Sequence, residues 1–146
     1  KWAFCVFTRC LTRKMVMDDL YREIIIDRYK NPQHKGKLDK SDFSFEDENP
    51  LCGDHIQIEL RVDEFRNVVE AKFDGHGCAI SVSAADLLLD SIIGKSIEDL
   101  KKLKKQDILD LLGIELSPVR LKCALLSLKV LKAAVYELQE ADDNLA

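Results

Sequence analysis

The chain contains 146 residues, of which 47% are hydrophobic and 33% are charged. This length allows one compact domain and excludes a two-domain enzyme, and the composition excludes a disordered or fibrous chain. No apolar run approaches the roughly 20 residues that cross a bilayer. The formal net charge of -4 argues against the cationic surface that nucleic acid requires. We therefore expect a globular protein that binds neither membranes nor nucleic acid.

The amino-terminal segment 1–17 differs from the rest of the chain. It has four basic residues, no acidic residue and several large apolar ones, whereas the remainder carries a net charge of -8. Such a segment is an organellar address, a cloning remnant or translation from upstream of a start at Met15 or Met17. We expect residues 1–17 to lie outside the fold, residues 18–140 to form the domain and residues 141–146 to form an acidic tail. The predicted compartment is the cytoplasm, or an organellar matrix if Lys1 to Met17 is a genuine targeting segment.

The first predicted element is a helix over residues 20–29 that Asp18 or Asp19 caps. Its apolar residues Leu20, Ile24 and Ile25 are expected on one buried face. Asn31-Pro32 ends this helix. A short edge strand is predicted over residues 43–46.

Alternating apolar residues then predict two strands, over residues 55–62 and 68–73. A polar turn around residues 63–67 makes them an antiparallel hairpin. The Gly75-His76-Gly77 sequence is expected to end the second strand. The side chains expected to face inward are Ile56, Ile58, Leu60, Val62, Val69, Ala71 and Phe73.

Four helical segments are predicted in the second half of the chain. The first covers residues 81–93 and ends at Gly94. Ser96 and Asp99 resemble a capping box that opens the second, through residue 105, and Asp107 caps a brief third one to residue 112. Ser117-Pro118 starts a long helix to about residue 139. The fold class is therefore α+β, with a small antiparallel sheet of about three strands packed against helices and a long C-terminal helix.

Three of the five cysteines fall within the predicted domain, at positions 52, 78 and 123; Cys5 and Cys10 lie in the leader and are interpreted as incidental. Three thiols cannot all pair, so a reducing compartment is expected. Each lies near an element end: Cys52 before a strand, Cys78 before a helix and Cys123 in the second turn of another helix. Because helix amino termini stabilise thiolates, we expect lowered pKa values for Cys78 and Cys123.

Asp54 follows Cys52 by two residues on an extended segment, so the two side chains point to the same side. Three thiolates and one carboxylate suit zinc, or iron in an iron–sulfur cluster. One oxygen ligand leaves an iron that can be displaced, as a site that builds and releases clusters requires. His76 is an alternative ligand, although an exposed loop histidine is the simpler interpretation.

Three blocks of this sequence resemble the signature blocks of the NifU/IscU/SufU iron–sulfur assembly scaffold family. They are NPLCGD at 49–54, GHGCAIS at 75–81 and SPVRLKCA at 117–124, and the segment 20–38 is similar to the family's opening helix and loop. The resemblance implies that Cys52, Asp54, Cys78 and Cys123 surround a metal or nascent cluster, most plausibly a transient [2Fe-2S] cluster, with Zn2+ in the resting form. It also implies a cysteine desulfurase that delivers sulfur to Cys123, and apo iron–sulfur proteins that receive the cluster.

The branch of the family is ambiguous from these blocks. Lys122 stands where the IscU branch has histidine, as in the SufU branch, whereas the separation of 45 between Cys78 and Cys123 is closer to the IscU length. Leu116 to Arg120 resembles, imperfectly, the Leu-Pro-Pro-Val-Lys element through which IscU proteins engage an Hsp70-type chaperone.

Three functions are compatible with these residues. The first is a scaffold that assembles a cluster on three cysteines and Asp54 and transfers it, a carrier role and not turnover of a small substrate. The second is a zinc-dependent sulfur acceptor of the SufU type, in which ligand exchange frees Cys123 to take sulfur. The third, a structural zinc domain, fits Asp54 poorly because closed structural sites are usually built from Cys and His.

Overall fold

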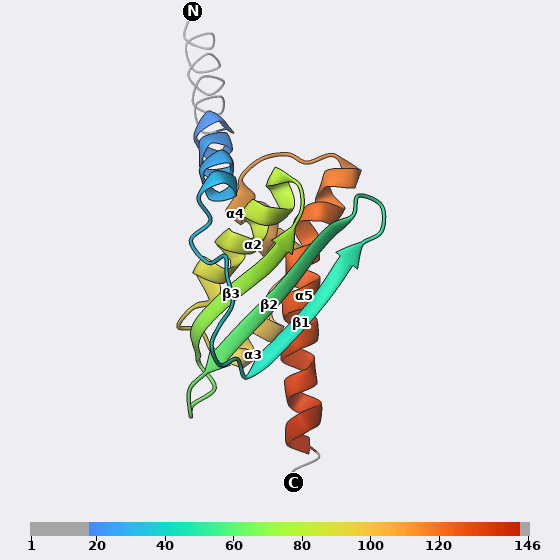
Figure 1. Cartoon of the computed structure of the whole chain (residues 1–146). Coiled ribbons are helices and arrows are strands. Elements are labelled where there is room, and N and C mark those ends of the chain that lie inside the picture. Colours follow the sequence, from blue (N-terminus) through green and yellow to red (C-terminus); the bar gives the residue numbers. More distant parts are fainter. Residues whose placement is uncertain (1–17, 144–146) are drawn as a thin grey trace, which may run out of the picture.

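The computed structural model describes residues 18–143, with side chains described through residue 136. Residues 18–30 are helical. The elements that follow are β1 (Phe43–Asn49), β2 (Asp54–Val62), β3 (Val68–His76), α2 (Ala79–Ile92), α3 (Ile97–Lys101), α4 (Lys105–Leu112) and α5 (Pro118–Asp143) (Figure 1). Residues 1–17, with Cys5 and Cys10 and the prediction made for this segment, lie outside the described part of the chain. No helix among the described residues is long and apolar enough to cross a membrane.

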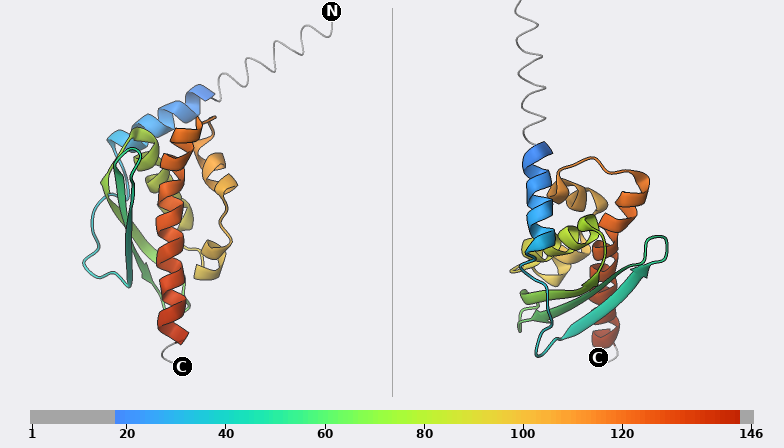
Figure 2. Two further views of the ribbon diagram at one scale, coloured as in Figure 1. Left: turned by 90° about the vertical axis from the view of Figure 1, so that its right-hand side faces the viewer. Right: turned by 45° about the horizontal axis from the view of Figure 1, so that its top comes forward.

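The three strands form one antiparallel sheet in the order β1-β2-β3, which confirms the predicted α+β class and the edge position of β1. Helices α2 and α5 cover one face of this sheet (Figure 2). The opposite, open face carries no helix among the described residues and is crossed only by the segment 31–42, where the Leu38 N–H donates to the Glu59 side chain. Alternating residues of β2 enter the core beneath the helices, since Ile56, Ile58 and Leu60 are fully buried. The predicted helix stripe is also confirmed, with Ala84, Ala85, Leu88, Leu89 and Ile92 all buried.

The strands differ from the predictions in three places. Strand β1 extends to Asn49 and β3 continues through Gly75 to His76, because β1 pairs with β2 as far as Asp54 and β3 pairs with it as far as His55. Gly75 remains in the strand with φ at 128°, a conformation that glycine adopts readily. Val69 is 48% exposed and does not face inward, since the register shifts at this end of the hairpin and Val68 takes the buried place opposite Val62.

The helix ends also differ. Helix α2 begins at Ala79 and ends at Ile92, and α3 ends at Lys101 instead of residue 105. Ser96 caps α3 as predicted, by accepting a hydrogen bond from the Asp99 backbone N–H. The N-cap of α4 is Lys104, and Asp107 instead accepts a hydrogen bond from its N–H at 2.7 Å. Helix α5 begins at Pro118 as predicted but continues to Asp143, into the predicted tail.

The first helix lies on the surface and buries fewer apolar side chains than its sequence pattern predicts. Ile25 is 5% exposed, whereas Leu20 and Ile24 are 54% and 42% exposed, and Asp18 and Asp19 already lie within the helix. A charged contact holds this helix to α2. Arg28 donates to the fully buried Asp86 at 2.8 Å.

Candidate metal centre

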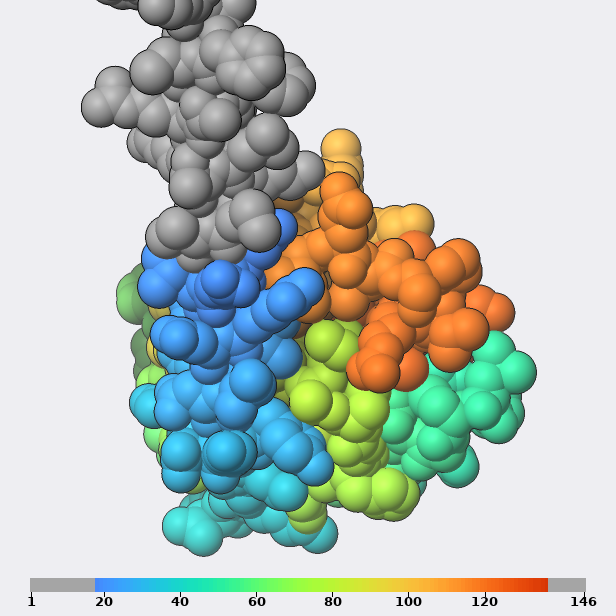
Figure 3. Space-filling model, turned by 90° about the horizontal axis from the view of Figure 1, so that it is seen from above, coloured from blue at the N-terminus to red at the C-terminus, as the bar shows by residue number. Residues whose placement is uncertain are grey.

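Four segments that are distant in the sequence meet at one end of the molecule. They are the first helix, the start of α2, residues 113–123 and the loop between β1 and β2, which share the face shown in Figure 3. All three cysteines of the domain are supplied by the last three of these segments. The site is therefore built from chain turns, where backbone N–H groups and side chains can converge without interrupting the sheet.

The loop that carries Cys52 is held by Asn49, the last residue of β1. The Asn49 side chain accepts a hydrogen bond from the Leu51 N–H at 3.1 Å, and its carbonyl accepts from the N–H groups of Cys52 and Gly53. Gly53 has φ at 72°, which an L-residue rarely adopts. This turn reverses the chain and leaves Cys52 exposed at the mouth of the site.

Asp54, the first residue of β2, places its carboxylate at the centre of the site with only 3% of the residue exposed. Oδ2 accepts from the Cys52 thiol at 3.1 Å and Oδ1 accepts from the Cys78 N–H at 3.1 Å. Burial by itself would raise the pKa of Asp54, but the hydrogen bonds from these groups, from Cys123 and from Ser81 outweigh it and lower that pKa. The carboxylate is therefore ionised at neutral pH.

Cys123 lies in the second turn of α5, as predicted, and is 4% exposed. Its Sγ is 3.4 Å from Sγ of Cys52. Its predicted low pKa is wrong. Burial, the hydrogen bonds with Cys52 and Asp54, and the nearby charges of Cys78 and Asp54 raise the pKa of this thiol. The second turn of a helix offers no free backbone N–H to offset these effects.

Cys78 is the N-cap residue of α2 and is half-buried. Its Sγ lies 3.8 Å from Asp54 Oδ2 and 3.8 Å from Ser81 Oγ. The neighbouring Gly77 is needed for space and not for a positive φ, because a Cβ there would clash with Ser81 Oγ and approach Asp54 Oδ1 to 3.0 Å. By contrast, Gly53 and Gly75 have positive φ values, at 72° and 128°.

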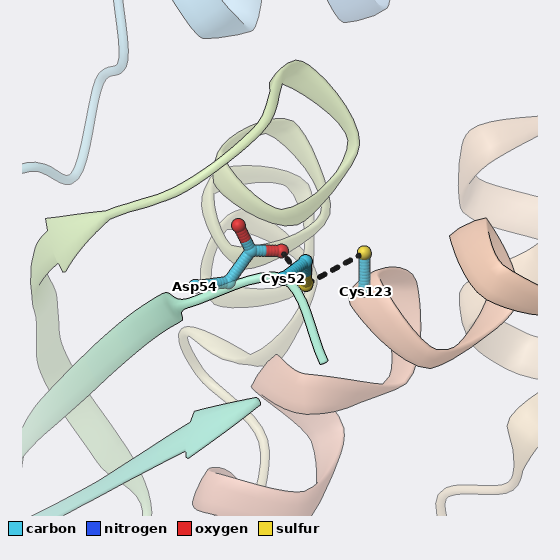
Figure 4. Close-up of side chains that lie close together, drawn as sticks. All are labelled: Cys52, Asp54 and Cys123. Carbon is cyan, nitrogen blue, oxygen red and sulfur yellow. Dashed lines mark hydrogen bonds between the residues drawn. The ribbon is translucent and has the colours of Figure 1, made fainter. Parts of the chain in front are cut away.

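The donor atoms of Cys52, Asp54 and Cys123 all lie within 4.8 Å of one another, and Figure 4 shows Asp54 and Cys123 on either side of Cys52. Cys78 stands slightly apart from this group and reaches it through Asp54. The structure thus brings together the four residues that the sequence analysis selected.

Two other residues considered in the sequence analysis lie outside this group. His76 is exposed at the end of β3 and stacks on His55. Lys122 is exposed on α5, and within the described part of the chain it forms no ion pair with Asp54.

The site carries a buried negative charge that no described side chain neutralises, and this favours the binding of a cation. An ionised carboxylate is buried among thiols, and no cationic side chain among residues 18–136 pairs with it. Thiols and carboxylates are ligands for zinc and for iron. A bound metal ion would supply the missing positive charge and favour the deprotonated thiols.

Two contributors to the site were not anticipated from the sequence. Asn49 shapes the Cys52 loop, and Ser81 is fully buried and hydrogen-bonded to the Cys78 carbonyl at 3.2 Å. Asn-Pro is a turn signal that points to Asn49. Nothing in the local sequence distinguishes Ser81 from other small residues of α2.

Comparison with known proteins agrees with the geometry. The family model of the NifU-like N terminal domain matches residues 20–144. The chain belongs to this family. It is 38% identical over 137 residues to the zinc-dependent sulfurtransferase SufU of Bacillus subtilis, a match that covers 82% of this chain and 91% of the relative. It is 37% identical over 121 residues to the iron-sulfur cluster assembly enzyme IscU of Drosophila melanogaster, covering 81% and 77%.

Solved structures support the same assignment. FiSufU of Fervidobacterium islandicum AW-1, an assembly-scaffold candidate for the SUF system, superposes with a TM-score of 0.67 at 29% identity, covering 77% of this chain and 94% of that one. The N-terminal part of a NifU-like protein from Brucella abortus has the same fold, with a TM-score of 0.67 at 18% identity and coverage of 84% and 96%.

Proposed function

We propose that this NifU-like domain is an iron–sulfur cluster assembly scaffold, which builds a cluster on Cys52, Asp54, Cys78 and Cys123 and passes it to apo-proteins. The observation that carries the proposal is the convergence of thiols from three remote segments on one buried, ionised carboxylate. Relatives named IscU scaffold proteins support it, for example that of Haemophilus influenzae at 35% identity over 120 residues. We propose a [2Fe-2S] cluster as the transient product.

The four ligands have different roles in this proposal. The thiolates of Cys52, Cys78 and Cys123 bind iron strongly, while Asp54 supplies the weaker oxygen ligand at which iron can be exchanged. Asp54 also orders the empty site, since its oxygens accept hydrogen bonds from Cys52 and from the Cys78 backbone. This explains how the site keeps its geometry between one cluster and the next.

Sulfur would come from a cysteine desulfurase. The exposure of each thiol determines which cysteine can receive it first. In a persulfide transfer, the acceptor thiolate attacks the outer sulfur and the donor leaves as a thiolate. Cys123 is our proposed acceptor, but it is 4% exposed, whereas Cys52 is exposed and lies 3.4 Å from it. We propose that Cys52 takes the sulfur first and hands it to Cys123 by a second exchange of the same kind.

A zinc-dependent sulfur acceptor is the second candidate function. The 38% identity to the Bacillus subtilis SufU favours it, as does Lys122, which leaves the last ligand position without a neighbouring histidine. In this alternative, zinc binds Cys52, Asp54 and Cys78, and ligand exchange frees Cys123.

The proposed partners beyond the desulfurase are recipient apo iron–sulfur proteins and an Hsp70-type chaperone. The segment proposed for the chaperone is accessible, since residues 117–120 are exposed and Leu116 lines an open cleft of about 800 Å³ beside the first helix and α4. We propose the cytoplasm as the compartment, or an organellar matrix if residues 1–17 are a targeting segment.

Anaerobic reconstitution separates the two functions. Iron(III), sulfide and a thiol that keeps the cysteines reduced should give the broad visible absorption of a [2Fe-2S] cluster. The Asp54→Ala variant should hold that cluster longer because the exchangeable oxygen ligand is gone. Zinc bound at the cysteine site, no visible chromophore after reconstitution and faster desulfurase turnover would instead establish the sulfur acceptor. An unchanged or shorter cluster lifetime in Asp54→Ala would refute the role of Asp54 in release.

A further inference from the structure

The open face of the sheet carries two of the three histidines of the chain side by side. His55 of β2 and His76 of β3 are directly opposite in the strand register. Their rings stack with centroids 6.0 Å apart and planes inclined by 26°. On the other side of His55, Glu46 of β1 places Oε2 3.2 Å from Nε2 of His55. One imidazole is thus flanked by a second imidazole and a carboxylate, each from a different strand.

This cluster lies on the opposite face of the sheet from the cysteine site. Successive residues of a strand point to opposite faces, so Asp54 faces the buried thiols and His55 faces outward. Glu48, which is exposed and directly opposite His55 in the register, adds another carboxylate to the same patch. Both sets of ligands therefore include a residue of β2, Asp54 in one and His55 in the other, but they share no donor atom.

We propose that His55, His76 and Glu46 form a second metal site, for a borderline divalent transition ion such as Zn2+. Directly opposed residues on neighbouring strands have Cβ atoms about 4.5–5.5 Å apart, which lets two imidazoles reach one ion. Zinc–nitrogen bonds of about 2.0–2.1 Å then require both rings to rotate out of their stacked arrangement and the Glu46 side chain to follow, because the three donor atoms do not yet converge on one point. A His₂Glu set discriminates against Mg2+ and Ca2+, which prefer oxygen ligands alone.

The side chains are free to make this adjustment. Side-chain exposure is 31% for His55 and 62% for Glu46, and His76 is exposed as well, so no core packing has to change. An ion would replace one weak surface hydrogen bond by three bonds and leave a coordination position for water. The site is independent of the proposed cluster assembly, because it contains no thiol.

Cobalt(II), a spectroscopic probe of zinc sites, can count and distinguish the two sites in the reduced, full-length protein. We expect two equivalents to bind, one with thiolate-to-cobalt charge-transfer absorption and one without it. The His55→Ala/His76→Ala variant should lose only the second equivalent, and Glu46→Gln should weaken it at least tenfold. His34→Asn is the matched control, since His34 is the remaining histidine and contacts Asp90 on α2; it should bind two equivalents.

The proposal is overturned if the wild-type protein binds only the equivalent with thiolate absorption. It is also overturned if the double-histidine variant still binds two equivalents with unchanged affinities. Imidazole proton resonances provide a check that does not depend on stoichiometry: zinc should shift those of His55 and His76 and leave those of His34 in place. If the wild-type protein showed no thiolate-to-cobalt absorption and assembled no cluster but still bound the histidine-dependent equivalent, the proposed function would be refuted and this second site would stand.

Discussion

The negative charges of two buried carboxylates in this domain have different partners. Asp86 of α2 is fully buried and accepts hydrogen bonds from the Arg28 guanidinium and from the His34 backbone N–H, both at 2.8 Å. Asp54 is 3% exposed and accepts from thiols and from the Cys78 N–H, with no cationic side chain among its described partners. Burying an unpaired charge is costly. Asp86 is therefore a completed structural pair, and Asp54 is a carboxylate that lacks its cation.

The largest expected effect is the loss of the completed pair. Arg28→Ala should lower the free energy of unfolding by about 3 kcal/mol, because it leaves Asp86 charged and buried without a counter-ion. Chemical denaturation of the metal-free protein measures this. Arg61→Ala is the matched control: Arg61 pairs with Glu70 at 2.9 Å, but both side chains are well exposed, so the loss should be below about 1 kcal/mol. Equal losses in the two variants would contradict the structural role of Arg28.

The next effect comes from crowding the unpaired carboxylate. Gly77→Ala should cost about 1–3 kcal/mol of stability and displace Asp54, because the new Cβ meets Ser81 Oγ and the Asp54 carboxylate. Zinc affinity should fall together with stability. Gly94→Ala provides the comparison, since Gly94 has φ at 88° but no neighbour within 4 Å, and should leave zinc affinity unchanged. Normal zinc binding by Gly77→Ala would show that the site tolerates a shift of Asp54.

Removing the charge of Asp54 should affect metal binding more than folding. In Asp54→Asn we expect zinc affinity to fall at least about tenfold, while the unfolding free energy of the metal-free protein changes by less than about 1 kcal/mol, because no ion pair is broken. Competition with a chromophoric chelator measures the affinity. Asp47→Asn, which removes an ion pair with Lys129 on α5, should leave zinc affinity unchanged. A large loss of metal-free stability in Asp54→Asn would make Asp54 a structural residue like Asp86.

The smallest expected effect is on the acid dependence of stability. Because the pKa of Asp54 is lower in the folded state than the ordinary value of about 3.9, its ionised form adds stability above that value. This contribution disappears as the pH falls through the folded-state pKa. The difference in unfolding free energy between wild type and Asp54→Asn should therefore be constant near neutral pH and change only below about pH 4. A change between pH 5 and 7 would contradict the lowered pKa.

Much of the fold follows from periodicity in the sequence. The alternation in β2, the apolar stripe of α2 and the Ser-Pro start of α5 each depend on local chemistry, and each is found where it was predicted. The inward position predicted for Val69 is wrong, because the register shift that turns this side chain outward depends on how two strands pair and not on the sequence of one strand. Leu20 and Ile24 are exposed, contrary to the prediction. The face that a helix buries depends on contacts with other elements, such as the Arg28–Asp86 contact 58 positions apart, and its own apolar pattern does not encode them.

The candidate site was predictable in its residue types and not in its electrostatics. Element ends supply the three cysteines, and the two-residue spacing places Asp54 beside Cys52. The raised pKa of Cys123 could not be inferred, since it depends on burial and on Cys52, Asp54 and Cys78, which all come from other segments. The same holds for the missing cation beside Asp54, which only the assembled fold reveals.

X-ray absorption at the zinc edge tests the central claim most directly, with the His55→Ala/His76→Ala variant loaded with one equivalent of zinc. If three thiolates and the Asp54 carboxylate converge on one ion, the first shell contains three sulfur atoms at about 2.3 Å and one oxygen at about 2.0 Å. A shell with one sulfur or none would contradict the account, because the thiols of Cys52, Cys78 and Cys123 would then not share a metal.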